Sequence, residues 1–126
     1  MNDGAPAIQA QGLACHFGDI RAIEDVSFAV RPGELFGLVG PDGAGKTTLL
    51  RMLAGVLRPT AGDAIVAGTS VVADPERVKP DLAYMSQRFG LYTDLTVAEN
   101  IEFYADLYRV PRGVRAARLE RLYQFS

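Results

Sequence analysis

The chain has 126 residues, of which 48% are hydrophobic and 22% are charged, a balance typical of one soluble globular domain rather than a disordered chain. The net charge of −2 argues against a broad nucleic-acid-binding surface. A single cysteine excludes an intramolecular disulfide, and no apolar run approaches the ~18 residues that a membrane-spanning helix needs.

Three strands are predicted in the first forty residues. Ile8–Phe17 holds short apolar alternation, and Glu24–Val30 places alternate apolar side chains on one face, which is the period of a half-buried strand. The turn residues Arg31–Glu34 follow. Leu35–Val39 is then a continuous apolar run, which favours a fully buried strand of the parallel type.

The next elements alternate between helix and strand. Lys46–Leu57 carries leucines at helical spacing and ends at a Pro- and Gly-containing turn. Ala64–Ala67 and Asp81–Ser86 are each predicted to form a short strand, the second of them buried.

Two helices are predicted near the end of the sequence. Thr96 and Glu99 match a capping box, in which the hydroxyl and the carboxylate each accept from the other residue's backbone. The helix that follows is expected to run to about Tyr108. Val114–Phe125 is predicted as a second helix whose basic face is solvated.

A glycine-rich segment separates the third predicted strand from the first helix and fits G-x-x-x-x-G-K-[ST] in full. Its glycines permit positive φ and a close approach of the backbone to phosphate oxygens. The lysine supplies a mobile positive charge, and the last hydroxyl is suited to ligate magnesium. An accidental glycine-rich turn is disfavoured, because a strand precedes the segment and an amphipathic helix follows it. The residues are Gly40, Pro41, Asp42, Gly43, Ala44, Gly45, Lys46 and Thr47.

Nearly the whole chain, from about Ile8 to Tyr108, resembles the ATP-binding subunits of ABC transporters. The glycine-rich loop, the segment LAGVLRPTAG and the segment YMSQRFGLYTDLTVAEN carry the resemblance. Within the last of these, LYTDLTVAEN is most similar to ATPase subunits of ABC-2-type exporters, the multidrug efflux group. The resemblance implies an α/β P-loop NTPase fold. It places an ABC-type nucleotide-binding core with an N-terminal antiparallel β-subdomain in residues 7–87, and the start of a helical subdomain in 88–126.

The resemblance also assigns roles to three further residues. Phe17 matches the aromatic residue that stacks on adenine; relatives more often carry Tyr, and the alternative is a core aromatic closing the first strand. Gln87 matches the glutamine that reaches the magnesium ion and the attacking water. Thr48 matches a residue that adds a hydroxyl near the α-phosphate, its other role being ordinary capping of the first helical turn.

A cluster of apolar side chains follows Gln87. In relatives, the region that corresponds to Phe89–Thr96 receives a coupling helix from the membrane subunit. If these side chains are exposed, they form an apolar patch suited to a partner; if they are buried, they belong to the core. The sequence leaves both interpretations open.

Asp42 departs from the pattern of the relatives, which more often have Asn at this position of the loop. A carboxylate repels triphosphate oxygens unless it points outward or meets a cation, so we expect nucleotide binding slightly weaker than with Asn.

Several parts of the family pattern are missing from these 126 residues: an LSGGQ-like signature, an apolar strand that ends in Asp-Glu, and a switch histidine. The sequence is therefore expected to stop before the signature and Walker B motifs. It would keep the phosphate cradle and lack the glutamate that acts as general base. Leu35–Val39 would then also lack a neighbouring strand.

The resemblance implies a subunit that binds ATP and Mg²⁺ and couples the energy to an ABC exporter. It would work with membrane-spanning permease subunits, as a homodimer or with a paired second ATPase cassette, at the cytoplasmic face of the cell membrane and without nucleic acid. The alternative is a non-enzymatic nucleotide-binding fragment or regulatory module. A P-loop kinase is disfavoured, because the LAGVLRPTAG segment and Gln87 fit the ABC pattern.

Overall fold

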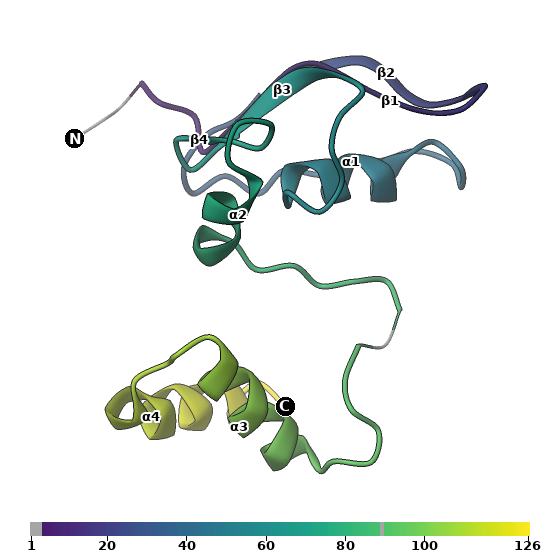
Figure 1. The fold of residues 1–126 in the computed structure, drawn as a ribbon. Coiled ribbons are helices and arrows are strands. Elements are labelled where there is room, and N and C mark those ends of the chain that lie inside the picture. Colours follow the sequence, from purple (N-terminus) through teal and green to yellow (C-terminus); the bar gives the residue numbers. More distant parts are fainter. Residues whose placement is uncertain (1–3, 89) are drawn as a thin grey trace. The chain divides into compact units, whose positions relative to one another are not determined.

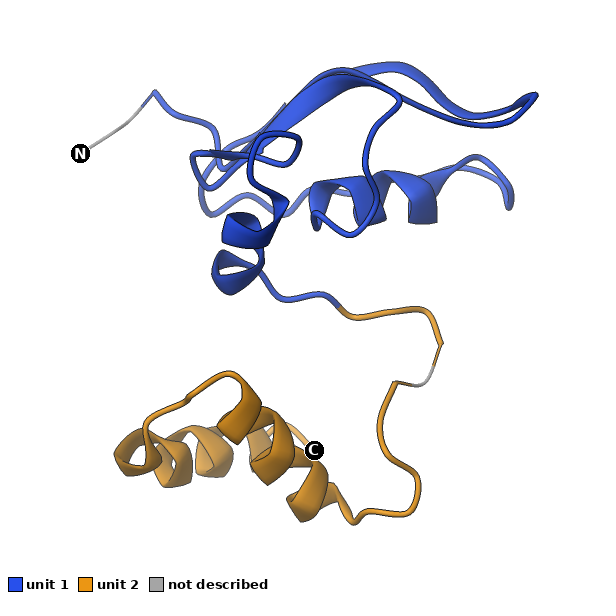
Figure 2. Cartoon of the chain, viewed as in Figure 1, with its two compact units in different colours: residues 1–84 blue, residues 85–126 orange. Residues whose placement is uncertain are grey.

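The computed structural model describes residues 4–88 and 90–126. They form two compact units, one ending at Tyr84 and the other running from Met85 to Ser126 (Figure 2). Each unit has its own secondary structure.

An antiparallel hairpin opens the first unit. β1 covers Ile8–Phe17, as predicted, and β2 covers Ile20–Val30, four residues longer than the predicted Glu24–Val30. The extra length arises because the connecting turn is only two residues long, so pairing already begins between Phe17 and Ile20. Gly18 has φ of 59°, the left-handed conformation that glycine adopts in such tight turns.

β1 also pairs on its other edge. β3 (Ala61–Val66) runs antiparallel to it, and the two-residue β4 (Thr69–Ser70) follows β3, so the sheet order is β2-β1-β3-β4. β3 starts three residues before the predicted Ala64–Ala67, and β4 was not predicted at all.

The helices α1 (Lys46–Leu53) and α2 (Pro75–Val78) lie on one face of this sheet (Figure 1). A short 3₁₀ turn, η1 (Lys79–Asp81), continues from α2. α1 is shorter than the predicted Lys46–Leu57, because Gly55 takes φ of 73° and ends the helix. The core between the helices and the sheet consists of Ala10, Leu13, Cys15, Ile23, Leu49, Met52, Leu53, Ala64, Val66, Val71 and Val78.

Two predicted strands are wrong for this chain. Leu35–Val39 and Asp81–Ser86 contain no strand; only the single residue Asp81 belongs to regular structure, as the end of η1. Leu35 is fully exposed and Val39 is 98% exposed. An extended segment becomes a strand only when a neighbour accepts its backbone hydrogen bonds, and no described residue pairs with these segments.

The second unit is a pair of helices, α3 (Val97–Leu107) and α4 (Arg112–Tyr123). The predicted capping box is confirmed: the Glu99 N–H donates to Thr96 Oγ1 at 3.1 Å, and the Thr96 N–H donates to Glu99 Oε1 at 3.0 Å. The backbone hydrogen bond from Thr96 lowers the pKa of the Glu99 carboxyl. The prediction for the last helix was Val114–Phe125. α4 is shifted from it by two residues toward the N-terminus at both ends.

Arg115 joins the two helices of this unit. Its guanidinium contacts Glu102 at 3.0 Å and Asp106 at 2.9 Å, and it also donates twice to the Val110 carbonyl. The Arg115 side chain is 11% exposed, so it is packed between α3 and α4 and does not belong to the solvated basic face that was predicted for the second helix.

Gly45 fixes where α1 begins relative to the sheet. Its φ is 93°, and a Cβ at this position would lie 2.5 Å from the Ala22 carbonyl oxygen and 2.7 Å from Ile23 Cδ1 on β2. Gly43 also has a positive φ, 82°, but a Cβ there would meet nothing within 4 Å. The two positions therefore differ in packing and share a left-handed backbone.

Replacing Gly45 with Ala is expected to destabilise the first unit by about 3 kcal/mol, because the cost of a left-handed alanine adds to a steric clash with β2. The matched change Gly43→Ala is expected to cost only ~1–2 kcal/mol, the backbone cost alone. Urea unfolding followed by circular dichroism measures both losses. Equal losses in the two variants would contradict the close packing of Gly45 on β2.

A polypeptide of these 126 residues is expected to melt broadly and to aggregate below ~55 °C, an ordinary melting temperature for a mesophile domain. The reason is the exposed run Leu35–Val39, whose apolar side chains and backbone groups are free to associate with other copies. Val39→Lys should slow this aggregation in light-scattering measurements. A sharp cooperative transition above ~55 °C for the unaltered polypeptide would refute the expectation.

Candidate functional site

The glycine-rich loop forms a tight turn directly before α1. The Ala44 N–H donates to the Pro41 carbonyl at 3.2 Å, and Gly43 and Gly45 adopt the left-handed backbone conformation. Asp42 is exposed on this turn. Alternation of left-handed residues with ordinary ones turns successive N–H groups toward one side, which is the geometry of an anion-binding nest.

Lys46 folds back over the loop from the first position of α1. Its ammonium group donates to the Pro41 carbonyl at 2.8 Å and to the Gly40 carbonyl. Both acceptors belong to the same turn, so the charged end of Lys46 is held beside the loop backbone. Lys46, the one basic side chain of residues 40–48, is thus held at the backbone of this loop.

The first turn of α1 is free of competing negative charge. It contains no acidic residue, and its N-cap, Gly45, has no side chain with which to cap the helix. The N–H groups of the first helical residues have no intrahelical acceptor, and the helix dipole places partial positive charge at the same end. Thr47 is exposed and Thr48 is half-buried in this turn. The arrangement suits a phosphate group.

Phe17 lies on the hairpin against which this loop packs. It ends β1 and is 49% exposed, unlike a core aromatic, so the structure does not favour the alternative of a buried residue closing the strand. The contact of Gly45 with Ala22 and Ile23 brings the loop against β2. Ile23 pairs with Cys15, two residues before Phe17. The aromatic face and the phosphate loop therefore belong to neighbouring parts of one unit.

Gln87 lies in the second unit, on an exposed bend between η1 and α3. The structure thus gathers residues 40–48 into one loop and helix start, sets Phe17 on the adjoining hairpin, and places Gln87 on the other unit. Phe89 is outside the described residues.

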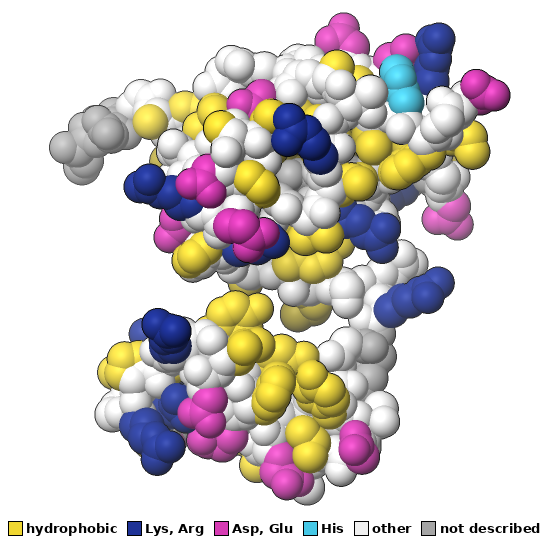
Figure 3. Space-filling view, in the orientation of Figure 1, with side chains coloured by type: hydrophobic (Ala, Val, Ile, Leu, Met, Phe, Trp, Pro, Cys, Tyr) yellow, Lys and Arg dark blue, Asp and Glu magenta, His cyan; other side chains and the backbone are white. Residues whose placement is uncertain are grey.

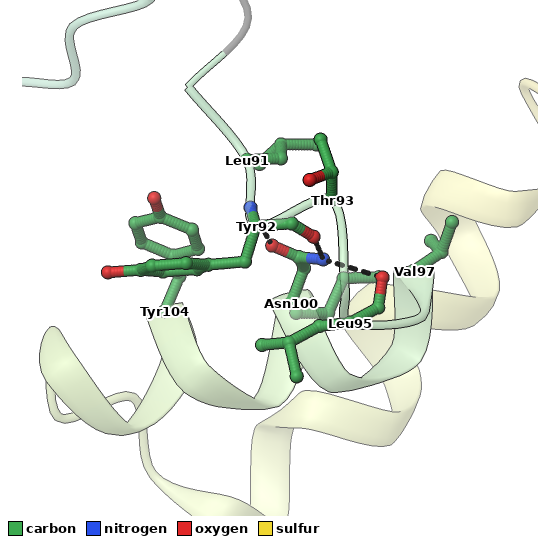
Figure 4. A pocket seen from close by; sticks show the side chains of 8 residues that line it. Leu91, Tyr92, Thr93, Leu95, Val97, Asn100 and Tyr104 are labelled. Carbon is green, nitrogen blue, oxygen red and sulfur yellow. Dashed lines mark hydrogen bonds between the residues drawn. The ribbon is translucent and has the colours of Figure 1, made fainter.

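The segment after Gln87 carries an exposed apolar surface on the second unit (Figure 3). Leu91 and Tyr92 are exposed and Leu95 is half-buried, so these side chains do not belong to a core of the described residues. A pocket of about 480 Å³ opens there. Its apolar and aromatic lining residues are Leu91, Tyr92, Leu95, Val97, Ile101 and Tyr104 (Figure 4).

Sequence reasoning missed Asn100, a buried polar residue that lines this pocket. It is 5% exposed and makes hydrogen bonds to the backbone of the preceding loop. The available signal was an amide side chain in the second turn of a helix, a position where Asn is a poor helix former unless it has a specific partner.

The chemical groups of the loop are those that bind a nucleotide triphosphate with magnesium. A nest of N–H groups, the Lys46 ammonium and the Thr47 hydroxyl are the donors and ligand that such a group requires. Residues 4–88 and 90–126 contain no group of three or more His, Cys, Asp or Glu side chains that could hold a metal ion. Within the same residues, no helix is both long enough and apolar enough to cross a membrane.

Comparison with known proteins agrees with this geometry. Residues 23–125 match the family model described as ABC transporter. The chain is 40% identical over 119 residues to the probable multidrug ABC transporter ATP-binding protein YbhF of Escherichia coli, covering 94% of this chain and 21% of that protein. It is also 40% identical over 118 residues to the spermidine/putrescine import ATP-binding protein PotA of Rubrobacter xylanophilus, covering 93% of this chain and 31% of that protein.

A solved ATP-binding subunit of an ABC transporter superposes with a TM-score of 0.75 at 28% identity, covering 91% of this chain and 52% of that subunit. The predicted fold class, an α/β ATP-binding core with an antiparallel β-subdomain, is thereby confirmed. The chain spans about half of that subunit and a fifth to a third of the two relatives. Because the family model covers most of its residues, the chain belongs to the ATP-binding domains of the ABC transporter family.

Proposed function

We propose that this chain binds ATP with Mg²⁺ as part of the energy-coupling subunit of an ABC exporter. The observation that carries the proposal is the start of α1: Lys46 lies over a left-handed glycine loop, at a helix end without acidic residues or a side-chain cap. Among residues 40–48 the one acidic side chain is the exposed Asp42, and the one basic side chain is Lys46.

Each residue of the site has a distinct role in this proposal. The backbone of Gly40–Gly45 and the Lys46 ammonium bind the phosphates, and Thr48 adds a hydroxyl near the α-phosphate. Phe17 offers its exposed face for stacking on adenine. Thr47 and Gln87 supply oxygen ligands to the magnesium ion, and Gln87 also orients the attacking water.

Hydrolysis is proposed to require more than these 126 residues. They contain no Walker B strand ending in Asp-Glu and no signature segment. Phosphoryl transfer depends on positioning and charge stabilisation, so a site that lacks the general base should hold ATP without turning it over. The alternative function, a non-enzymatic nucleotide-binding fragment or regulatory module, has the same site and differs in its partners.

The proposed partners are the permease subunits of an exporter, together with a second ATPase domain, either a second copy of this chain or a paired cassette. The exposed surface around Leu91 and Tyr92 would receive the permease from the cytoplasmic side of the membrane. Sequence identity to relatives does not separate export from import, since the chain is 40% identical both to the multidrug protein YbhF and to the import protein PotA. The exporter assignment rests on the segment LYTDLTVAEN, which is similar to the ABC-2 group.

Lys46→Ala is expected to weaken ATP binding at least about tenfold, because it removes a charge-assisted contact to phosphate. Lys79→Ala is the matched control: Lys79 pairs with Glu76 on α2 and should leave binding unchanged. Isothermal titration with ATP and Mg²⁺ measures both. Binding that survives Lys46→Ala unaltered would refute the phosphate site, and Lys46-dependent turnover by the 126-residue chain would contradict the proposed lack of hydrolysis.

Asp42→Asn is expected to tighten ATP binding a few-fold at low salt, because it removes a carboxylate from the exposed turn of the phosphate loop. The gain should shrink as salt rises toward ~0.15 M, where the Debye length falls to about 8 Å. Titrations at two salt concentrations provide the measurement. An Asn variant that binds ATP no more tightly at low salt would count against this electrostatic role.

A further inference from the structure

The positive charge of the chain is concentrated in and beside α4. Residues 109–126 contain five arginines and one acidic residue, so their formal charge is +4. Residues 1–108 contain eight basic and fourteen acidic residues, so their formal charge is −6. Dark blue side chains accordingly gather over α4 on the second unit (Figure 3). A positive helix in a chain that is otherwise negative indicates an anionic partner for that helix.

The arginines of α4 stand three residues apart, so they wind around the helix. A helix turns about 100° per residue, and each step of three residues therefore shifts the side chain by roughly 60°. Arg115 faces α3, where Glu102 and Asp106 pair with it. Arg118 and Arg121 point progressively away from α3, and both are exposed. Among the described residues, neither has an acidic side chain within ion-pair distance, so their charges are available to a partner.

The same side of α4 also carries apolar side chains. Five exposed residues recur at the spacing of one helical face and form the α4 stripe: Val114, Arg118, Arg121, Leu122 and Phe125. Leu122 is 63% exposed and Phe125 is 92% exposed. Phe125 lies in a turn that continues the helix, since its N–H donates to the Leu122 carbonyl at 3.1 Å.

The α4 stripe contains no negative charge. Glu120 is the one acidic residue of 109–126, and it stands two residues before Leu122, a separation that places it nearly opposite on the helix. The stripe is therefore basic and apolar at once. A helix face that only needs to be solvated would have no use for the exposed Leu122 and Phe125.

A lipid headgroup layer provides partners for both kinds of side chain. Guanidinium groups bind the phosphates of anionic lipids, while neighbouring apolar side chains enter the boundary with the acyl chains. The long arginine stem can lie along apolar surface and keep its charge in the headgroup layer. A long nucleic acid is a poorer fit, because it would also meet the net negative charge of residues 1–108.

We propose that the α4 stripe binds the anionic phospholipid surface of a membrane, with α4 lying in the headgroup layer. The inference uses no residue of the nucleotide site and goes beyond the proposed function. Near such a surface, each arginine raises the binding constant about fivefold.

The test measures binding of the full-length protein to vesicles by flotation. One kind of vesicle is phosphatidylcholine alone, and the other is an equal mixture of phosphatidylcholine and the anionic phosphatidylglycerol. The unaltered protein should bind the mixed vesicles and leave the neutral ones free. Binding should weaken as salt rises, because salt screens the attraction between arginine and the surface. Equal binding to both kinds of vesicle, or binding to neither, would overturn the inference.

The double variant Arg118→Gln with Arg121→Gln should bind the mixed vesicles about 25-fold more weakly, about fivefold for each arginine. Lysine at both positions should keep the binding, since it carries the same charge. The matched control, Arg58→Gln with Arg77→Gln, removes two exposed arginines of the first unit and should leave binding unchanged. An equal loss in the control would mean that only total charge matters, which refutes a contact at the α4 stripe.

Leu122→Ser tests the apolar part of the α4 stripe. It should weaken binding to the mixed vesicles roughly fivefold, because less apolar surface enters the lipid. Unchanged binding of a folded Leu122→Ser protein, checked by circular dichroism, would refute the position of α4 in the headgroup layer. If this variant unfolds, the arginine variants decide the inference.

Two further measurements separate this inference from other partners and from the nucleotide site. A protein that ignores vesicles but binds single-stranded RNA through Arg118 and Arg121 would have a nucleic-acid partner, and the lipid inference would be wrong. Lys46→Ala should leave vesicle binding unchanged, because Lys46 belongs to the phosphate loop. Failure of the proposed ATP site and failure of the lipid contact therefore give different results.

Discussion

The contact between Gly45 and β2 determines what the first unit can present to a ligand. The backbone of Gly45 approaches the Ala22 carbonyl so closely that a Cβ would lie 2.5 Å from it. This approach seats the first turn of α1 against the hairpin. The phosphate loop is thereby held between a fixed helix start and the strand pair that carries Phe17. Without the contact between Gly45 and β2, the N–H groups of the loop would have no defined direction relative to the ring of Phe17.

The same contact explains why the helix start lacks an ordinary cap. A side chain at the N-cap that accepted from the first turn would occupy the donors that a phosphate needs. Glycine at this position satisfies the left-handed backbone, the close packing and the need for free donors at once. In the second unit, by contrast, the side chains of Thr96 and Glu99 cap the start of α3, each accepting a hydrogen bond from the other residue's backbone N–H. A capped helix start is suited to a structural role and an uncapped one to an anion.

The sequence predicted local structure well and tertiary structure less well. The capping box and the glycine-rich loop followed from spacing alone, because residues close together in the sequence determine both of them. β1 formed over its predicted residues because β2 and β3 pair with its two edges. Leu35–Val39 has the composition of a buried strand, but strand formation needs a hydrogen-bonding neighbour, which composition does not supply. The hydrogen bonds of Asn100 were missed for a related reason: their partners are backbone groups of a loop, and only the folded backbone brings them to the side chain. The adenine contact of Phe17 and the magnesium contact of Gln87 stay predictions.

The two units differ in how their exposed apolar residues are held, and this difference bears on function. In the first unit, Leu35 and Val39 project from a segment without regular structure, so their exposure is a liability for aggregation. In the second unit, Leu91 and Tyr92 are equally apolar, but their backbone is tied to α3 through Asn100 and Tyr104. A surface with a defined shape can select one partner, whereas an unheld segment associates with any apolar surface. The hydrogen bonds of Asn100 and Tyr104 therefore give this exposed apolar surface a defined shape, which Leu35 and Val39 lack.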